Sequence, residues 1–206
     1  MALDGTYDGL KASVADFLNR GDLGAVCGDF IRLAEGQINT RLKVRRMIIR
    51  ASTTVVSEFC QLPSDFNGPL SVALSTGEVL DCMAADALTE TKRCSGGLTG
   101  GTPRAYAVVG SQFQFWPAPA DGTEVDLTYY AKLPALSADN PTNWLLTDRP
   151  DVYLYGALLQ SAPYLQDDAR LSVWAELFTT LVADLQLADA HESQGARLTP
   201  RASQVA

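Results

Sequence analysis

Apolar residues recur at helical spacing near the N-terminus. Leu10, Val14, Phe17 and Leu18 fall at positions i, i+4, i+7 and i+8, which is one face of an α-helix. A second run follows with the same period: Val26, Phe30, Leu33, Ala34, Ile38 and Leu42. The pair Gly21–Asp22 separates the two runs, and Asp22 is predicted to cap the second helix. Residues 1–46 are therefore predicted to form a helical hairpin.

Helical patterns return after Trp144. A segment rich in Tyr, Leu and Ala, residues 148–161, is predicted to be a helix capped by Thr147 or Asp148 and ended by Pro163. Neither this segment nor the N-terminal hairpin can bury its apolar face alone. The two are therefore expected to pack against each other.

A longer helix is predicted to start at Asp167 or Asp168. Its apolar stripe comprises Leu171, Trp174, Leu177, Phe178, Leu181 and Leu185. Residues 136–194 are thus predicted to be C-terminal helices that pack on the hairpin. Residues 195–206 have no such stripe and are predicted to be a flexible tail.

Between the helical regions, residues 47–135 are rich in Val, Thr, Ile and Phe, with Gly and Pro at short intervals. Such a pattern predicts strands. The predicted strands span residues 47–56, 59–62, 70–74, 79–83, 104–109, 112–116 and 124–132. In the last, Val125, Leu127 and Tyr129 alternate with polar residues, so one face is expected to be buried. A short helix is predicted over residues 84–92. The fold class is therefore α+β: a helical bundle with an inserted antiparallel β domain.

Composition narrows the function classes. The chain has 206 residues, 47% of them apolar, and a formal net charge of −8. The negative charge argues against tight nonspecific binding to nucleic acid. No apolar run approaches the roughly 18 residues typical of a membrane span, and the N-terminus lacks the pattern of a secretory signal. The four cysteines form no C-x-x-C pair and are expected to be reduced thiols, although a Cys82–Cys94 pairing stays open.

Residues with catalytic potential have simpler structural interpretations. His191, the only histidine, is predicted to be a solvated residue near a helix C-terminus rather than a general base. Asp167 and Asp168 point about 100° apart on a helix, so they are expected to cap it rather than act on one substrate. The glycine-rich stretch 94–102 lacks the order of a phosphate-binding loop and is expected to be a mobile loop. No catalytic residue, cofactor site or metal site is predicted.

A basic cluster interrupts the acidic chain. It comprises Arg41, Lys43, Arg45, Arg46 and Arg50. Three interpretations remain open. The cations could be a solvated group at a helix C-terminus, a salt-bridge patch facing a neighbouring subunit or a portal, or a patch facing DNA.

Several segments resemble the head-to-tail adaptor (connector) proteins of tailed bacteriophages and gene transfer agents. The longest are YYAKLPALSADNPTNWLL and PDVYLYGALLQSAPYLQDD, residues 129–146 and 150–168. GDFIRLAEGQINTRLKVR, QLPSDF and TPRAYAVVG agree with the same family. Together these segments span most of residues 7–190.

The resemblance implies a non-enzymatic structural protein of the virion. Such adaptors bind the portal vertex as a ring, usually with twelvefold symmetry, extend the DNA channel and dock the tail. The implied partners are the portal protein, a tail or further connector protein, neighbouring copies, and genomic DNA that passes without sequence-specific binding. The implied location is the head–tail junction, after assembly in the bacterial cytoplasm. The C-terminal tail would reach the portal, with Arg197, Leu198 and Arg201 as its anchors.

Two other function classes stay open at this point. One is a small tail-associated glycoside hydrolase that uses paired carboxylates. The other is a carbohydrate-binding module, in which tyrosines and tryptophans would stack on sugars. Core packing is the simpler use for those aromatic side chains.

Overall fold

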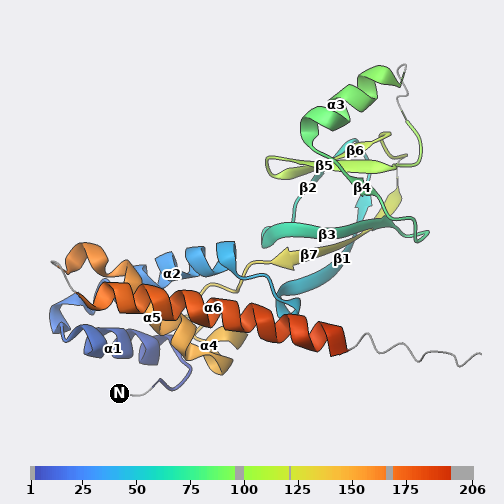
Figure 1. The fold of residues 1–206 in the computed structure, drawn as a ribbon. Helices are drawn as coiled ribbons and strands as arrows, with labels where there is room; N and C mark the ends of the chain where they lie inside the picture. The colour runs from blue at the N-terminus through green and yellow to red at the C-terminus, as the bar shows by residue number, and fades with distance from the viewer. Residues whose placement is uncertain (1–2, 96–99, 121, 166–168, 196–206) are drawn as a thin grey trace, which may run out of the picture. The chain divides into compact units, whose positions relative to one another are not determined.

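The computed structural model describes residues 3–95, 100–120, 122–165 and 169–195 (Figure 1). The chain divides into two compact units. The helical unit comprises Met1–Arg46 and Leu133–Ala206, and the β unit comprises Met47–Lys132. The α+β fold class is confirmed. The division into a hairpin over residues 1–46, a β-rich insertion over 47–135, C-terminal helices over 136–194 and a tail over 195–206 stays a prediction.

The helical unit is built around α5. Its helices are α1 (Tyr7–Leu18), α2 (Cys27–Arg41), α4 (Trp144–Asp148), α5 (Pro150–Gln160) and α6 (Arg170–Gly195), with short 3-10 turns at Gly21–Leu23, Arg45–Met47 and Ala162–Tyr164. Helix α5 contacts each of the other four helices (Figure 1). Its side chains are therefore buried almost all round, as the absence of a polar face predicts.

The buried face of α2 is wider than predicted and also includes Cys27, Ile31 and Glu35, whereas one predicted member of the helix points outward. Phe30, Ala34 and Ile38 are buried, whereas 55% of the Leu33 surface is exposed. The contact between α2 and α5 runs through Ala34, where Gly156 lets the two helices approach closely. Leu33 lies about 100° away around the helix and misses this line of contact.

Three predicted helix caps are wrong. Asp22 lies inside a 3-10 turn and pairs with Arg20, and α2 begins later, without a side-chain cap. Neither Thr147 nor Asp148 caps a helix. Instead, Asn143 Oδ1 accepts a hydrogen bond from Leu146 N (2.9 Å) and caps α4. The alternative caps of the last helix, Asp167 and Asp168, lie outside the described residues.

In its described residues, the β unit contains two sheets and one helix. Its elements are β1 (Ile48–Val55), β2 (Phe59–Gln61), β3 (Phe66–Leu74), β4 (Asp81–Cys82), α3 (Ala85–Cys94), β5 (Ala105–Val109), β6 (Gln112–Trp116) and β7 (Thr123–Ala131). One sheet has the order β1-β7-β3 and is antiparallel. The other has the order β2-β6-β5-β4, and its β4–β5 pair is parallel.

The parallel pair corrects the expectation of a purely antiparallel β domain. Strands β4 and β5 are joined by a crossover that contains α3, and parallel neighbours need such a long connection. The predicted alternation in β7 is confirmed: Val125, Leu127 and Tyr129 are buried in the core of the β unit.

Gly156 lies where helices of the bundle approach closely, and Gly36 lies at an open position that serves as a control. A Cβ atom at Gly156 would lie 3.1 Å from Phe178 Cε2 and 3.2 Å from Ala34 Cβ, whereas a Cβ at Gly36 would meet nothing within 4 Å. We expect Gly156→Leu to destabilise the fold by about 1–3 kcal/mol through overpacking. Gly36→Ala should stabilise it by up to about 1 kcal/mol, because α2 gains helix propensity. Urea denaturation of both variants measures the difference, and a Gly156→Leu variant as stable as wild type would contradict the packing described.

Candidate protein-interaction surfaces

The turn-rich segment between β7 and α4 is anchored by side chains of α2. Leu133 N donates a hydrogen bond to Asn39 Oδ1 (2.8 Å), and Leu136 N donates one to Glu35 Oε1 (2.8 Å). Glu35 and Asn39 are four residues apart, so they lie on one face of α2. Since extended segments of the chain need partners for their backbone N–H groups, these two side chains fix the path of the segment.

Asn143 and Tyr153 extend this anchor towards α5. Asn143 Nδ2 donates to Tyr153 Oη (2.7 Å) and to the carbonyl of Pro134 (2.9 Å). Tyr153 Oη in turn donates to Glu35 Oε1 at 3.4 Å. Tyr153 is fully buried, so its hydroxyl lies inside the core.

The network has electrostatic consequences for Glu35. Burial raises the pKa of Glu35, and its hydrogen bonds with Leu136 and Tyr153 offset part of that effect. Burial also raises the pKa of Tyr153. The sequence analysis missed Glu35, Asn39 and Asn143. One sequence signal for them was available: Glu35 and Asn39 are polar, four residues apart, and next to the apolar positions of α2.

Two arginines of the predicted basic cluster have acidic partners within their own unit. Arg45 pairs with Asp189 (3.0 Å) and with Glu192, both on α6. Arg46 pairs with Asp148 and lies over the Trp144 ring, 4.6 Å from its centroid. These contacts hold the end of α6 and the start of α4 beside residues 44–46.

The remaining cations of the cluster are engaged in other ways. Arg41 lies over the Phe178 ring, and burial lowers the pKa of Lys43. Arg50 belongs to the β unit, where it pairs with Asp126 (2.9 Å). A role for the cluster towards a neighbouring copy, a portal or DNA stays a prediction. The predicted tail anchors Arg197, Leu198 and Arg201 lie outside the described residues.

Helix α6 has apolar side chains on two opposite faces. Trp174, Phe178 and Val182 are buried in the core. Val173, Leu177 and Leu187 lie within one arc of about 80° on the other side, and they are exposed by 53%, 37% and 58%. We call these three residues the outer face of α6. The prediction that Leu177 belongs to the buried stripe is therefore wrong, because the core accepts only one side of this helix.

The second apolar face makes α6 unusually hydrophobic. By length and composition alone, its residues Arg170–Glu192 would suffice to cross a membrane. A single helix of this kind is weak evidence for a membrane span, and the buried row of α6 packs on α5 as in a helical bundle. The outer face is thus a candidate surface for protein contact.

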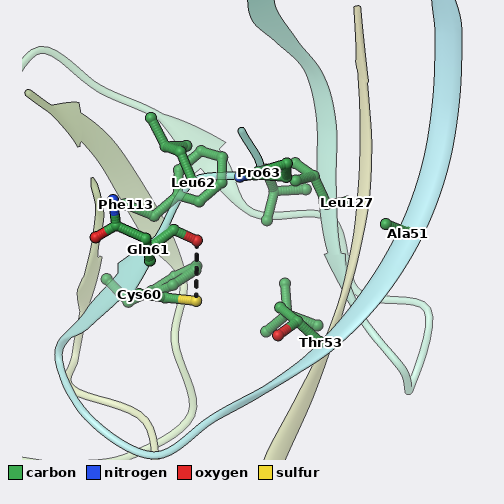
Figure 2. Close-up of a pocket in the computed structure, with 11 residues that line it drawn as sticks. Ala51, Thr53, Cys60, Gln61, Leu62, Pro63, Phe113 and Leu127 are labelled. Carbon is green, nitrogen blue, oxygen red and sulfur yellow. Dashed lines mark hydrogen bonds between the residues drawn. The ribbon is translucent and has the colours of Figure 1, made fainter. Parts of the chain in front are cut away.

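The β unit contains an apolar pocket of about 240 Å³ (Figure 2). It is lined by Ala51, Thr53, Cys60, Gln61, Leu62, Pro63, Val72, Phe113, Phe115, Val125 and Leu127. No charged side chain is present among these lining residues. Burial raises the pKa of Cys60, whose thiol donates a 3.7 Å hydrogen bond to the carbonyl of Gln61. The pocket is suited to an apolar group.

Most of the other candidate residues lie outside the described part of the chain. His191 is described and is exposed on α6. Asp167, Asp168 and residues 96–99 of the glycine-rich stretch lie outside the described residues. In the described part of the chain, no three His, Cys, Asp or Glu side chains are grouped as metal ligands. All four cysteines are free thiols, which resolves the open Cys82–Cys94 pairing.

Glu35 should make stability depend on pH. Because its folded-state pKa is raised, the unfolded chain loses this proton first as pH rises, and stability falls from the unfolded pKa upward through the folded pKa. Glu35→Gln should remove this dependence. Glu35→Ala should also remove it and should cost about 1–3 kcal/mol at low pH, because Leu136 N and Tyr153 Oη lose their acceptor, with a smaller cost as pH rises. Denaturation curves of wild type and both variants, measured at about pH 4 to 8, cover the range in which a carboxyl group with a raised pKa titrates. A Glu35→Gln variant that keeps the wild-type slope would refute this assignment.

Comparison with known proteins identifies the family. No curated protein matches the chain significantly. The family model described as SU10 adaptor protein matches residues 5–201. The match covers both units and includes the segment anchored by Glu35 and Asn39. The resemblance to phage head-to-tail adaptors is therefore confirmed, and the chain belongs to the SU10 adaptor protein family of phage structural adaptors.

Proposed function

We propose that this protein binds the portal vertex as a ring, extends the DNA channel and docks a tail or further connector protein. The observation that carries the proposal is the adaptor-family match over residues 5–201. An adaptor is a structural component of the virion at the head–tail junction, and its work is to hold other proteins together. The surfaces that contact those proteins are therefore the functional site.

Ring formation needs two different surfaces on each copy. A closed ring is built from heterologous contacts, in which one patch of a subunit meets another patch of its neighbour. The outer face of α6 supplies one apolar patch in this proposal. Leu33 of α2, exposed by 55%, is a further apolar side chain on the helical unit. Burying such side chains against a neighbour contributes favourable free energy, because apolar surface is removed from water.

The charge of the protein suits a DNA channel. Each copy brings a formal net charge of −8, so a ring concentrates negative charge around its axis. A negative wall repels phosphates, and the genome can slide past it without being held. A wall rich in unpaired Lys and Arg would grip the DNA instead, because each neutralised phosphate strengthens binding. In this proposal DNA is a passing molecule that is not recognised by sequence.

Contacts with the portal are assigned to charged groups and the C-terminal tail. We propose Arg197, Leu198 and Arg201 as anchors through charge and apolar contact. Arg45 and Arg46 already have acidic partners within the chain. We propose that, when a neighbour binds, these two arginines share their acidic partners with it or exchange them for acidic groups of the neighbour. We place assembly in the bacterial cytoplasm, with the ring forming on the portal.

Charges placed on the outer face of α6 test the ring. The double variant Val173→Glu/Leu177→Glu should weaken ring formation at least about tenfold, because two carboxylates would be buried without partners. Thr179→Glu is the matched control: it adds a carboxylate at another exposed position of the same helix, outside the apolar arc. Heads that carry the cognate portal but lack adaptor are mixed with each protein, and the bound copies are counted by native mass measurement and imaging.

The fold of each variant is checked by circular dichroism and thermal unfolding. Wild-type protein that does not bind such heads would refute the adaptor role proposed here. Normal rings from the double variant would refute the role of α6 while leaving portal binding intact.

A further inference from the structure

Strand β1 is an open edge of its sheet. It pairs with β7 along eight residues in continuous register, and the order β1-β7-β3 leaves its other side without a strand. Along an antiparallel strand, every second residue turns its N–H and C=O groups away from the partner. In the described part of the chain no backbone hydrogen bond reaches these outer groups. Such a row is a template for one more strand.

The opposite edge of this sheet is protected. Strand β3 carries Pro69 and two register shifts, both of which disfavour further pairing. Its C-terminal half is covered by the chain itself, since Leu74 N donates to Glu78 O and Leu80 N donates to Val72 O. The edge strands β2 and β4 of the second sheet span only three and two residues.

Strand β1 has none of these protections. It contains no proline, glycine or bulge over its eight residues. Its single charge, Arg50, is paired with Asp126. Because long edges with few charges favour aggregation unless they are covered, the contrast with β3 indicates that β1 is kept open for a partner.

The pocket of the β unit lies beside this edge. Ala51 and Thr53 of β1 form one side, and Cys60, Gln61 and Leu62 at β2 face them (Figure 2). Both β1 and β2 are edge strands, so the pocket lies at the side where both sheets end. Ala51 and Thr53 are small side chains, so they leave the pocket open. Val55, further along the same strand, belongs to the filled core. A cavity of about 150 Å³ can hold benzene, so 240 Å³ has room for one large apolar side chain.

We propose that an extended, uncharged segment of another protein of the particle adds to β1 as a fourth strand and inserts one large apolar side chain into this pocket. Main-chain hydrogen bonds would supply affinity, and the pocket would select the side chain. The pocket lining has no charge to match a charged segment. That the partner is a protein of the head–tail junction rests on the proposed function.

A second copy of this chain is a poorer match for the same edge. In the described residues, each strand already pairs within its own sheet, and the open half of β3 carries Pro69. Two β1 edges could pair directly, but only as an isologous dimer, which closes on itself and does not build the head-to-tail contacts of a ring. A separate protein with a free extended segment has no such restriction.

Two neighbouring residues of β1 allow a matched test. Ala51 lines the pocket, while Ser52 is exposed and points to the opposite face of the sheet by strand alternation. Ala51→Phe fills the pocket from inside, and Ser52→Phe adds a similar volume outside it. Thr53→Leu is a second pocket-filling variant, to be used if Ala51→Phe does not fold.

The first experiment uses a defined probe. Isotope-labelled protein is titrated with a capped heptapeptide of alternating threonine and valine with a central phenylalanine. We expect saturable amide shifts along β1 and at Cys60 to Leu62. Ala51→Phe should weaken binding at least about tenfold, and Ser52→Phe should stay within about twofold of wild type. An absence of shifts on β1, or equal binding by Ala51→Phe, would overturn the inference.

The second experiment uses the assembled particle. Hydrogen exchange of β1 is compared between the free protein and the protein bound to portal-bearing heads, with and without tail components. Slower exchange of alternate β1 amides in one assembly supports the inference and identifies which partner supplies the strand. Slower exchange in a self-ring alone would overturn it in favour of a second copy.

The outcomes separate this inference from the proposed function. A protein that binds heads and tails while β1 exchanges as in the free state contradicts the added strand and leaves the adaptor role standing. A protein that binds neither contradicts the adaptor role, and the peptide titration then decides the inference by itself.

Discussion

The helical unit depends on one buried carboxyl group. Glu35 accepts a hydrogen bond from Leu136 N and another from Tyr153 Oη, and it thereby joins α2, the segment before α4, and α5. Without an acceptor at this position, the backbone N–H of Leu136 and the O–H of Tyr153 would be buried without an acceptor, which costs more than either bond contributes when made. Burial also disfavours the charged form of this carboxyl group and so raises its pKa. The network therefore fixes the path of the chain more than it adds to stability.

That path determines the rest of the bundle. Once residues 133–143 are held on α2, Asn143 is in position to cap α4, and α5 starts two residues after α4 ends. Helix α5 then packs against α1, α2, α4 and α6, with Gly156 at the closest approach. The core is filled by one face of each surrounding helix. Helix α6 consequently keeps its second apolar face exposed, where a neighbouring protein can cover it.

Both units thus leave apolar or hydrogen-bonding surface unused. In the helical unit this surface is the outer face of α6, and in the β unit it is the edge of β1 with its adjacent pocket. Neither surface holds a group of converging acids or bases. For a member of a family of structural adaptors, surfaces suited to contact with other proteins are the expected functional elements.

The sequence by itself determined the kinds of elements and their order. Helical period at both ends, strand period between them and the alternation in β7 all reflect local spacing, which depends on whether a side chain faces a core. The adaptor motifs could also be recognised there, because they are contiguous. Tertiary structure decided what spacing cannot express: that Leu177 and Leu33 face outward, that β4 and β5 run parallel, and that Asn143 caps α4. The first two depend on contacts between residues far apart in the chain. The cap is local, since Asn143 accepts from Leu146 N, but Asn143 is also held by Pro134 and Tyr153. Glu35 depends on distant contacts as well, since its partners lie about a hundred residues away and are brought to it only by folding.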